Sequence, residues 1–470
     1  MWKNVLLLWL AFIIGLNGGH SQWFGNIVES NKGDTAATER CFCQLKGAID
    51  DCSCSVETID SFNNLKVYPR LNSLLHQDFF KYWKVNLNKK CPFWEDDSRC
   101  AIRYCSVKPC TEVPEGIKGS GKILGPEVKS KARPKDVSDC DHENDLGYLN
   151  TTLSKESQAR FERWAAHDSA QDSFCELDEV GDHDSQYVDL LLNPERYTGY
   201  VGDSAHRVWK SIYQENCFRP VKNPYADFSN IGADEFLKEM CLEKRTFYRA
   251  VSGLHSSINI HLAARYLLSD KTGFEVSSEG VWGHNIEEFQ RRFDPELTGG
   301  EGPRRLKNLY FLYLLELRAL AKAVPYLESL TYYTGNEEKD RDVRNAVKDL
   351  LSVVKSFPKH FDESSMFSSG LMQAATLKEE FRGHFRNISR IMDCVGCDKC
   401  RLWGKLQVTG LGTALKILFS GNFDQQLSLS AVRETKFQLS REEIVALFNG
   451  FGRLSSSIME LETFRQESLR

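Results

Sequence analysis

The stretch Leu306-Lys-Asn-Leu-Tyr-Phe-Leu-Tyr-Leu-Leu-Glu-Leu317 decides the fold class of this chain. Its apolar residues recur at helical spacing, and few polar ones interrupt them, so it predicts a buried helix at the centre of the fold. Two further segments are also typical of helices: Val343, Ala346, Val347, Leu350 and Val354, and the capping box Ser440-Arg-Glu-Glu443 before Ile444. Helical patterns prevail from about residue 155 onward, and strand-like alternation is scarce. The sequence therefore predicts a mainly α protein.

The amino-acid composition is typical of a soluble globular protein. It has 470 residues, 41% of them hydrophobic and 27% charged, and a formal net charge of −5. Neither sign of charge dominates, so we expect no nucleic-acid partner.

The N-terminus resembles a secretory signal peptide. Lys3 precedes an apolar run over residues 5–14, and Gly18 and Gly19 follow it. The run is shorter than the roughly 20 residues that a membrane span needs. We assign residues 1–20 to a signal peptide and expect a soluble lumenal or secreted protein. The sequons at Asn150 and Asn387 predict glycosylation and fit that compartment.

The 15 cysteines are an odd number, so at least one thiol has no partner within the chain. Disulfides are expected in an oxidising compartment. Four cysteines crowd the N-terminus, where nested bridges between Cys41 and Cys54 and between Cys43 and Cys52 are favoured over a four-thiolate zinc site. We expect a disulfide-stapled segment over residues 21–65 and one helical domain over residues 66–470. Within it, the Pro- and Gly-containing residues 111–139 predict a flexible loop.

Two cysteine groups have the spacing of redox sites. In Cys394-Val-Gly-Cys397-Asp-Lys-Cys400, residues three apart within one helical turn would share a face, and a helix N-terminus lowers a thiol pKa. A partial iron–sulfur ligand set, a zinc knuckle and a plain structural bridge remain alternatives. A bridge between Cys100 and Cys105 closes a loop too short to stabilise the fold much, and such bridges exchange readily.

Two labile pairs in one chain suggest an electron relay that ends on a cofactor, and flavin accepts electron pairs from thiols. Arg292 and Arg305 could neutralise a pyrophosphate. Ser252 and His255 would share a helix face, and Tyr200 and Trp209 could stack on rings. Each of these residues could instead have a purely structural role: the aromatic residues and His255 in the core, and the arginines as surface charges.

The sequence closely resembles the endoplasmic reticulum oxidoreductin-1 family of flavin-dependent thiol oxidases over nearly all of the chain after the signal peptide. The resemblance rests on Cys91-Pro-Phe-Trp, Cys100-x4-Cys105, Asn193-Pro-Glu-Arg-Tyr-Thr-Gly-Tyr200, Ser252-Gly-Leu-His255, Gly302-Pro-Arg-Arg305 and Cys394-x2-Cys397-x2-Cys400-Arg401. It implies a mainly helical catalytic domain with FAD held between helices.

The same resemblance implies roles for the matching residues. Cys100 and Cys105 would form the outer, shuttle pair, and Cys397 and Cys400 the inner pair, with Cys400 next to the flavin. The FAD contacts would be Arg196, Thr198, Tyr200, Trp209, Ser252, His255, Arg292 and Arg305. Structural bridges would join Cys91 to Cys394 and Cys217 to Cys241. In a resting form Cys110 would capture Cys105 and Cys140 would capture Cys100, which leaves Cys175 as the unpaired thiol.

The expected activity is oxidation of reduced protein disulfide isomerase in the lumen of the endoplasmic reticulum. Electrons would pass through the outer and inner pairs to FAD and then to oxygen, giving hydrogen peroxide. The C-terminal Glu467-Ser-Leu-Arg470 is no retention signal, so retention would need a partner or peripheral membrane association. The alternatives are a disulfide-rich secreted binding glycoprotein without catalysis and a secreted metalloprotein; we expect no metal.

Overall fold

The computed structural model describes residues 45, 47, 49, 54–93, 96–98, 101–102, 153–165, 172–178, 184–195, 208–209, 211–213, 242–268, 281–357, 361, 371–395, 398–420 and 437–468. The expected signal peptide, the sequon at Asn150 and the expected loop over residues 111–139 lie outside these residues.

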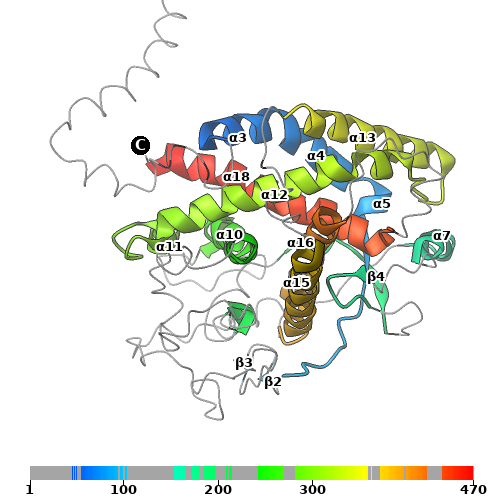
Figure 1. Ribbon diagram of the computed structural model, residues 1–470, viewed down its shortest axis with the longest axis horizontal. Helices are drawn as coiled ribbons and strands as arrows, with labels where there is room; N and C mark the ends of the chain where they lie inside the picture. Colours follow the sequence, from blue (N-terminus) through cyan, green and yellow to red (C-terminus); the bar gives the residue numbers. More distant parts are fainter. Residues whose placement is uncertain are drawn as a thin grey trace, which may run out of the picture.

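Helices dominate the described part of the chain (Figure 1). They are α3 (Val56–Phe62), the π-helix η2 (Asn63–Val67), α4 (Tyr68–Leu75), α5 (Asp78–Lys81), α7 (Lys155–Ala165), α10 (Leu242–Ala264), α11 (Ile286–Phe293), α12 (Glu301–Ser329), α13 (Glu337–Lys355), α15 (Leu371–Met392), α16 (Asp398–Phe419) and α18 (Arg441–Ser468). The prediction of a mainly α fold is confirmed.

The strands are short and pair in antiparallel twos. The pairs are β1 (Tyr82–Val85) with β4 (Gln186–Asp189), β2 (Asp96–Ser98) with β3 (Ala101–Ile102), and β5 (Tyr266–Leu268) with β6 (Val281–Gly283). Their brevity agrees with the scarcity of alternating patterns in the sequence.

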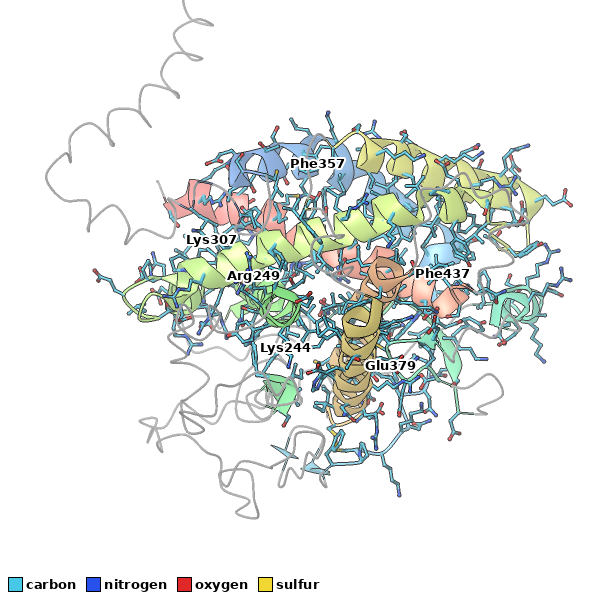
Figure 2. All side chains as sticks on the ribbon, in the orientation of Figure 1. Lys244, Arg249, Lys307, Phe357, Glu379 and Phe437 are labelled. Atoms are coloured by element: carbon cyan, nitrogen blue, oxygen red, sulfur yellow. A yellow bond between two sulfur atoms is a disulfide. The ribbon has the colours of Figure 1, made fainter. Side chains whose placement is uncertain are left out.

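Helix α12 lies at the centre, as its apolar stretch predicts. Leu306 and every residue from 308 to 317 are buried. It packs against α10, α13, α16 and α18, and crosses the molecule between α13 and α10 in Figure 1. Arg249 of α10 fills part of this boundary (Figure 2), with its guanidinium 4.0 Å from the ring centroid of Phe311. Gly253 allows the close approach, because a Cβ there would lie 2.4 Å from the Asn308 carbonyl oxygen.

The capping box at the start of α18 is also confirmed. The Glu443 amide donates to Ser440 Oγ at 3.1 Å, and the Ser440 amide donates to Glu443 Oε2 at 2.8 Å. Lys416 of α16 contacts both carboxylate oxygens of Glu443 at 3.0 Å. The cap therefore satisfies backbone amides at the start of α18 and also ties that start to α16.

The helices before residue 82 differ from the sequence prediction, which recognised helical patterns only from about residue 155. Helix α3 begins at Val56, inside the segment expected to be held by disulfides, and Ser55 caps it. These helices are short, so their periodicity is weak. Their apolar residues, such as Ile59 and Leu71, are buried where α3, η2 and α4 pack against α18.

Candidate active site

A disulfide fixes the turn between α15 and α16. Cys91 and Cys394 are bonded, with an S–S distance of 2.07 Å, as the family resemblance implies. Helix α15 ends at Met392, and the amides of Asp393, Cys394 and Val395 close its end with hydrogen bonds to carbonyls three residues earlier. The expectation that cysteines three apart in this motif lie within a helical turn does not hold for Cys394. It lies in the turn, because the cross-link to Cys91 and this tightened end stop α15 before α16 begins at Asp398.

Cys400 occupies the first turn of α16, is fully buried and takes part in a disulfide. Its expected partner, Cys397, lies outside the described residues. Zinc and iron–sulfur clusters bind thiolates rather than disulfide sulfurs. Two of the three cysteines of this motif are therefore oxidised, which argues against both metal-site alternatives. Among the described residues, no group of three or more potential ligands is arranged for a metal ion.

Two basic residues that follow Cys400 hold this turn. Arg401 donates from Nε to the Val395 carbonyl at 2.7 Å and from Nη1 to the Leu87 carbonyl at 2.5 Å. Lys405 is buried and lies 2.9 Å from Asp393 Oδ1 and 3.4 Å from Asp178 Oδ1. The sequence analysis assigned them no role, since their partners are distant in sequence.

A second group of side chains gathers around α10. His255 stacks on Trp209, with ring centroids 3.9 Å apart, and its Nδ1 lies 3.0 Å from the Tyr213 hydroxyl. Ser252, one turn earlier, accepts from Asn308 Nδ2 of α12 at 2.9 Å. Burial raises the pKa of Tyr213, so its phenol stays protonated. The prediction that Ser252 and His255 lie on one helix is confirmed, and Tyr213 is a member that the sequence analysis missed.

The two expected cations lie beside this group. Arg292 of α11 donates from Nη1 to Asn259 Oδ1 at 2.6 Å and from Nε to Glu288 Oε1 at 2.7 Å. Arg305 of α12 donates to the Arg292 carbonyl at 3.3 Å. Burial opposes the ionised form of Glu288, but hydrogen bonds and charges of Arg291 and Arg292 outweigh it and lower the Glu288 pKa. The carboxylate of Glu288 is therefore ionised and offsets part of the positive charge of Arg291 and Arg292.

Five expected cofactor contacts are therefore brought together: Trp209, Ser252, His255, Arg292 and Arg305. Arg196, Thr198 and Tyr200 lie outside the described residues. Flat aromatic faces, hydroxyl and imidazole groups and two guanidiniums match the chemistry of a flavin dinucleotide, which combines ring systems with a pyrophosphate. These residues therefore fit FAD.

The remaining site predictions vary in outcome. Cys175 carries a free, buried thiol, as predicted, and burial raises its pKa. Cys54 is buried, with its sulfur 3.5 Å from the Ser55 carbonyl. Asn387 is half-buried on α15, and the amide of Glu176 donates to the sequon residue Ser389. Cys41, Cys43, Cys52, Cys100, Cys105, Cys110, Cys140, Cys217 and Cys241 lie outside the described residues, so their pairings stay predictions.

Comparison with known proteins identifies the family. The family model described as Endoplasmic Reticulum Oxidoreductin 1 (ERO1) matches residues 66–461. This chain belongs to the ERO1 family. Relatives in the family include the Ero1-like protein of Drosophila melanogaster, 53% identical with 92% of each chain covered. The ERO1-like protein alpha of Mus musculus is 52% identical over 93% of this chain and 94% of its own.

The fold also matches a solved member of the ERO1 family. The structure of Ero1p entitled "Source of Disulfide Bonds for Oxidative Protein Folding in the Cell" aligns with a TM-score of 0.58 and 30% identity, over 88% of this chain and 98% of that chain. Family membership implies oxidoreductase activity. None of the helices in the described residues combines the length and apolar content needed to cross a bilayer.

Proposed function

We propose that this chain is an FAD-dependent thiol oxidase that makes disulfides for oxidative protein folding in the lumen of the endoplasmic reticulum. The observation that carries the proposal is Cys400, a buried and disulfide-bonded cysteine in the first turn of α16. A helix N-terminus stabilises the thiolate formed when such a bond opens. The relative Ero1p, named as a source of disulfide bonds, supports the same function.

The relay is a sequence of two thiol–disulfide exchanges. A thiolate of a reduced protein disulfide isomerase attacks the Cys100–Cys105 disulfide, and the second thiol of the isomerase completes the exchange. The isomerase leaves with a disulfide, and Cys100 and Cys105 become thiols. These thiols then reduce Cys397–Cys400 by the same exchange, so two electrons and two protons reach the inner pair.

The residues around α10 serve the cofactor in this proposal. Arg292 and Arg305, with Arg196, would bind the pyrophosphate, while Trp209, His255 and Tyr200 would contact rings and Ser252 and Thr198 would supply hydroxyl groups. When bound, FAD accepts the electron pair of the inner thiols and passes it to oxygen, which leaves as hydrogen peroxide. Arg401 and Lys405 keep the α15–α16 turn in place, so the inner pair can open without the turn unfolding.

Oxygen uptake with a dithiol substrate tests the relay. Cys397→Ala and Cys400→Ala should each abolish uptake while the purified protein retains visible flavin absorbance. Cys175→Ala, at the buried free thiol, is the matched control and should keep its activity. Normal turnover of either inner-pair variant would refute the assignment. A folded but colourless preparation would favour a binding glycoprotein without catalysis.

We also propose that the shuttle pair is controlled by Cys110 and Cys140. Pairing of Cys105 with Cys110 and of Cys100 with Cys140 would leave no outer disulfide to accept electrons. The double variant Cys110→Ala with Cys140→Ala should then oxidise thiols faster than the wild type, measured as initial oxygen uptake. Equal initial rates would argue against this control.

A further inference from the structure

The chain that leads into the expected cofactor motif is bound to the helix that carries Cys400. Trp403 of α16 donates from Nε1 to the Asn193 carbonyl at 2.8 Å, and Gln407 of α16 donates from Nε2 to Glu195 Oε1 at 2.7 Å. Cys400, Trp403 and Gln407 follow one another at spacings of three and four residues, so they lie on one face of α16. The face of α16 that bears Cys400 is therefore the face that holds this segment.

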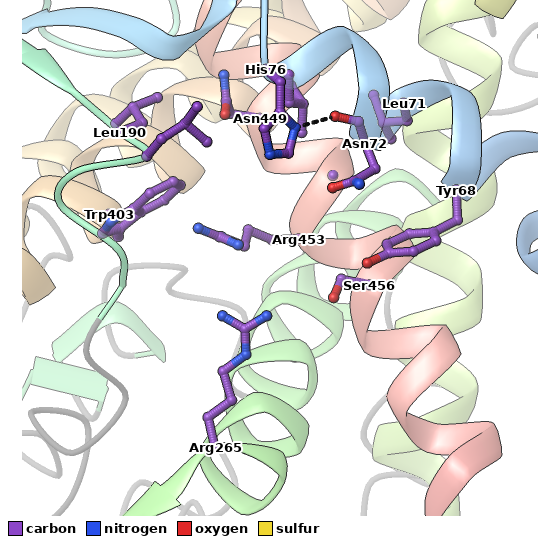
Figure 3. Close-up of a pocket in the computed structure, with 13 residues that line it drawn as sticks. Tyr68, Leu71, Asn72, His76, Leu190, Arg265, Trp403, Asn449, Arg453 and Ser456 are labelled. Carbon is purple, nitrogen blue, oxygen red and sulfur yellow. Dashed lines mark hydrogen bonds between the residues drawn. The ribbon is translucent and has the colours of Figure 1, made fainter. Parts of the chain in front are cut away.

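The carboxylate of Glu195 also contacts α18. Its Oε2 lies 3.2 Å from Arg453 Nε, and the Glu195 side chain is 0% exposed. The guanidinium carbon of Arg453 lies 3.9 Å from the ring centroid of Trp403, and Figure 3 shows Arg453 extending from α18 toward this ring. Gln407 Nε2 lies 3.2 Å from the Trp403 carbonyl, which closes a ring of contacts among these four residues. A buried charge is costly unless it is paired, so the ion pair and the segment that carries Glu195 depend on each other.

The place of Glu195 in the sequence gives these contacts a consequence for the site. Arg196 follows it directly, and the family resemblance assigns Arg196, Thr198 and Tyr200 to FAD. Consecutive Cα atoms lie about 3.8 Å apart, so the position of Glu195 determines where the chain enters these cofactor residues. A misplacement of about 1 Å between reacting groups can slow a reaction roughly a hundredfold. The contacts of Glu195 thus place the start of the cofactor residues relative to Cys400.

We propose that Glu195 is a positioning residue of the oxidase. Through Gln407 and Arg453 it holds the start of the flavin-binding motif on the face of α16 that bears Cys400, and so sets the distance between the inner pair and the flavin. Its role differs from that of a cofactor contact, because one carboxylate oxygen accepts from Gln407 and the other pairs with Arg453. The inference rests on the proposed function and adds to it a residue that acts through its neighbours.

Glu195→Gln tests this role, because it keeps the shape of the side chain and removes the charge that faces Arg453. The flavin-loaded protein is mixed with saturating dithiothreitol without oxygen, and bleaching of the flavin absorbance is followed. Two electrons and two protons then pass from dithiothreitol, which becomes a disulfide, through the cysteine pairs to the flavin. Dithionite, which reduces flavin without thiols, gives the reference rate. We expect reduction by dithiothreitol to be about tenfold slower or more, with its KM and the dithionite rate unchanged.

Glu443→Gln is the matched control, because it makes the same change in another buried ion pair between α16 and α18. The Glu443 and Lys416 side chains are each 1% exposed and lie 3.0 Å apart. Lys416 is near the far end of α16, about 24 Å from Cys400 along the helix. Glu443→Gln should lower the melting temperature, as Glu195→Gln does, but keep the wild-type ratio of the dithiothreitol and dithionite rates. This ratio therefore separates positioning from a loss of stability.

Gln407→Met decides the question if Glu195→Gln does not fold, since it removes the hydrogen bond to Glu195 and leaves the ion pair with Arg453 intact. It should slow reduction by dithiothreitol about threefold or more. Wild-type ratios in Glu195→Gln and Gln407→Met would overturn the positioning role and leave the proposed function standing. An equal loss in Glu443→Gln would also overturn it, because stability would then explain the effect. A colourless wild type, or a wild-type flavin that dithiothreitol does not reduce, would refute the proposed function and this inference with it.

Discussion

At the scale of single residues, the buried side chain of His261, on α10, contacts the backbone of α18 and makes the stability of the fold depend on pH. Its side chain is 1% exposed, and its Nε2 lies 2.9 Å from the Arg453 carbonyl. Burial, with a smaller contribution from the charge of Arg265, lowers the pKa of His261 from 6.5 to about 3. The folded state therefore keeps this histidine neutral at pH values where the unfolded chain protonates it.

This difference predicts a pH-dependent loss of stability. The contribution of His261 is fully present above pH 6.5 and falls as the pH drops toward about 3, because the unfolded state then binds one more proton. Between pH 6.5 and 5 the loss approaches about 2 kcal/mol. His261→Gln keeps a donor for the Arg453 carbonyl but cannot titrate, so its free energy of unfolding should decline less over this range. Urea unfolding at several pH values measures the slopes.

The exposed His76 provides the control for this experiment. His76→Gln should keep the wild-type slope between pH 6.5 and 5. If His261→Gln also keeps it, then His261 does not supply the pH dependence.

At the scale of elements, two glycines on neighbouring helices predict opposite effects of the same substitution. A Cβ at Gly410 of α16 would lie 2.4 Å from the Ala446 carbonyl oxygen of α18, whereas a Cβ at Gly383 of α15 meets nothing within 4 Å. Gly410→Ala should therefore destabilise the protein by about 1–3 kcal/mol, because rigid backbone must move. Gly383→Ala should stabilise it by up to about 1 kcal/mol, since alanine favours the helix.

Thermal unfolding of the two variants beside the wild type checks this pair. The result is informative because the chemical change is the same and only the surroundings differ. If both variants shifted the melting temperature equally, the close crossing of α16 and α18 would not require a glycine at position 410.

The sequence predicted elements where the local signal was strong. The apolar stretch over residues 306–317 and the Ser440–Glu443 capping box each occur within a few turns, and both are found as predicted. The break between α15 and α16 was missed, because it depends on the bond between Cys394 and Cys91, which are 303 residues apart. The short helices α3 and α4 were missed since their buried faces become apparent only against α18.

At the scale of the whole molecule, the Cys91–Cys394 disulfide joins the segment after β1 to the end of α15. Cross-links over long loops restrict the unfolded chain most, and loss of a native disulfide costs about 2–5 kcal/mol. The double variant Cys91→Ala with Cys394→Ala should lower the free energy of unfolding by this amount under non-reducing conditions. Because the same bond fixes the turn before Cys400, oxygen uptake should fall as well.

Reducing conditions provide the control for the disulfide variant. The wild type then loses the same bond, so the difference in stability between it and the double variant should vanish. A difference that persists in reductant would mean that side-chain packing, rather than the cross-link, accounts for the effect.

The sequence by itself determined the helical class, the redox-type cysteine spacings and the residue types suited to a flavin, because local periodicity and functional-group chemistry require no knowledge of distant partners. Only the tertiary structure decided that Tyr213 joins Ser252 and His255, that Arg401 and Lys405 hold the turn before the inner pair, and that Glu195 meets Gln407 and Arg453. Each of these depends on packing between helices far apart in the chain, where burial and excluded volume, rather than neighbouring residues, select the contact.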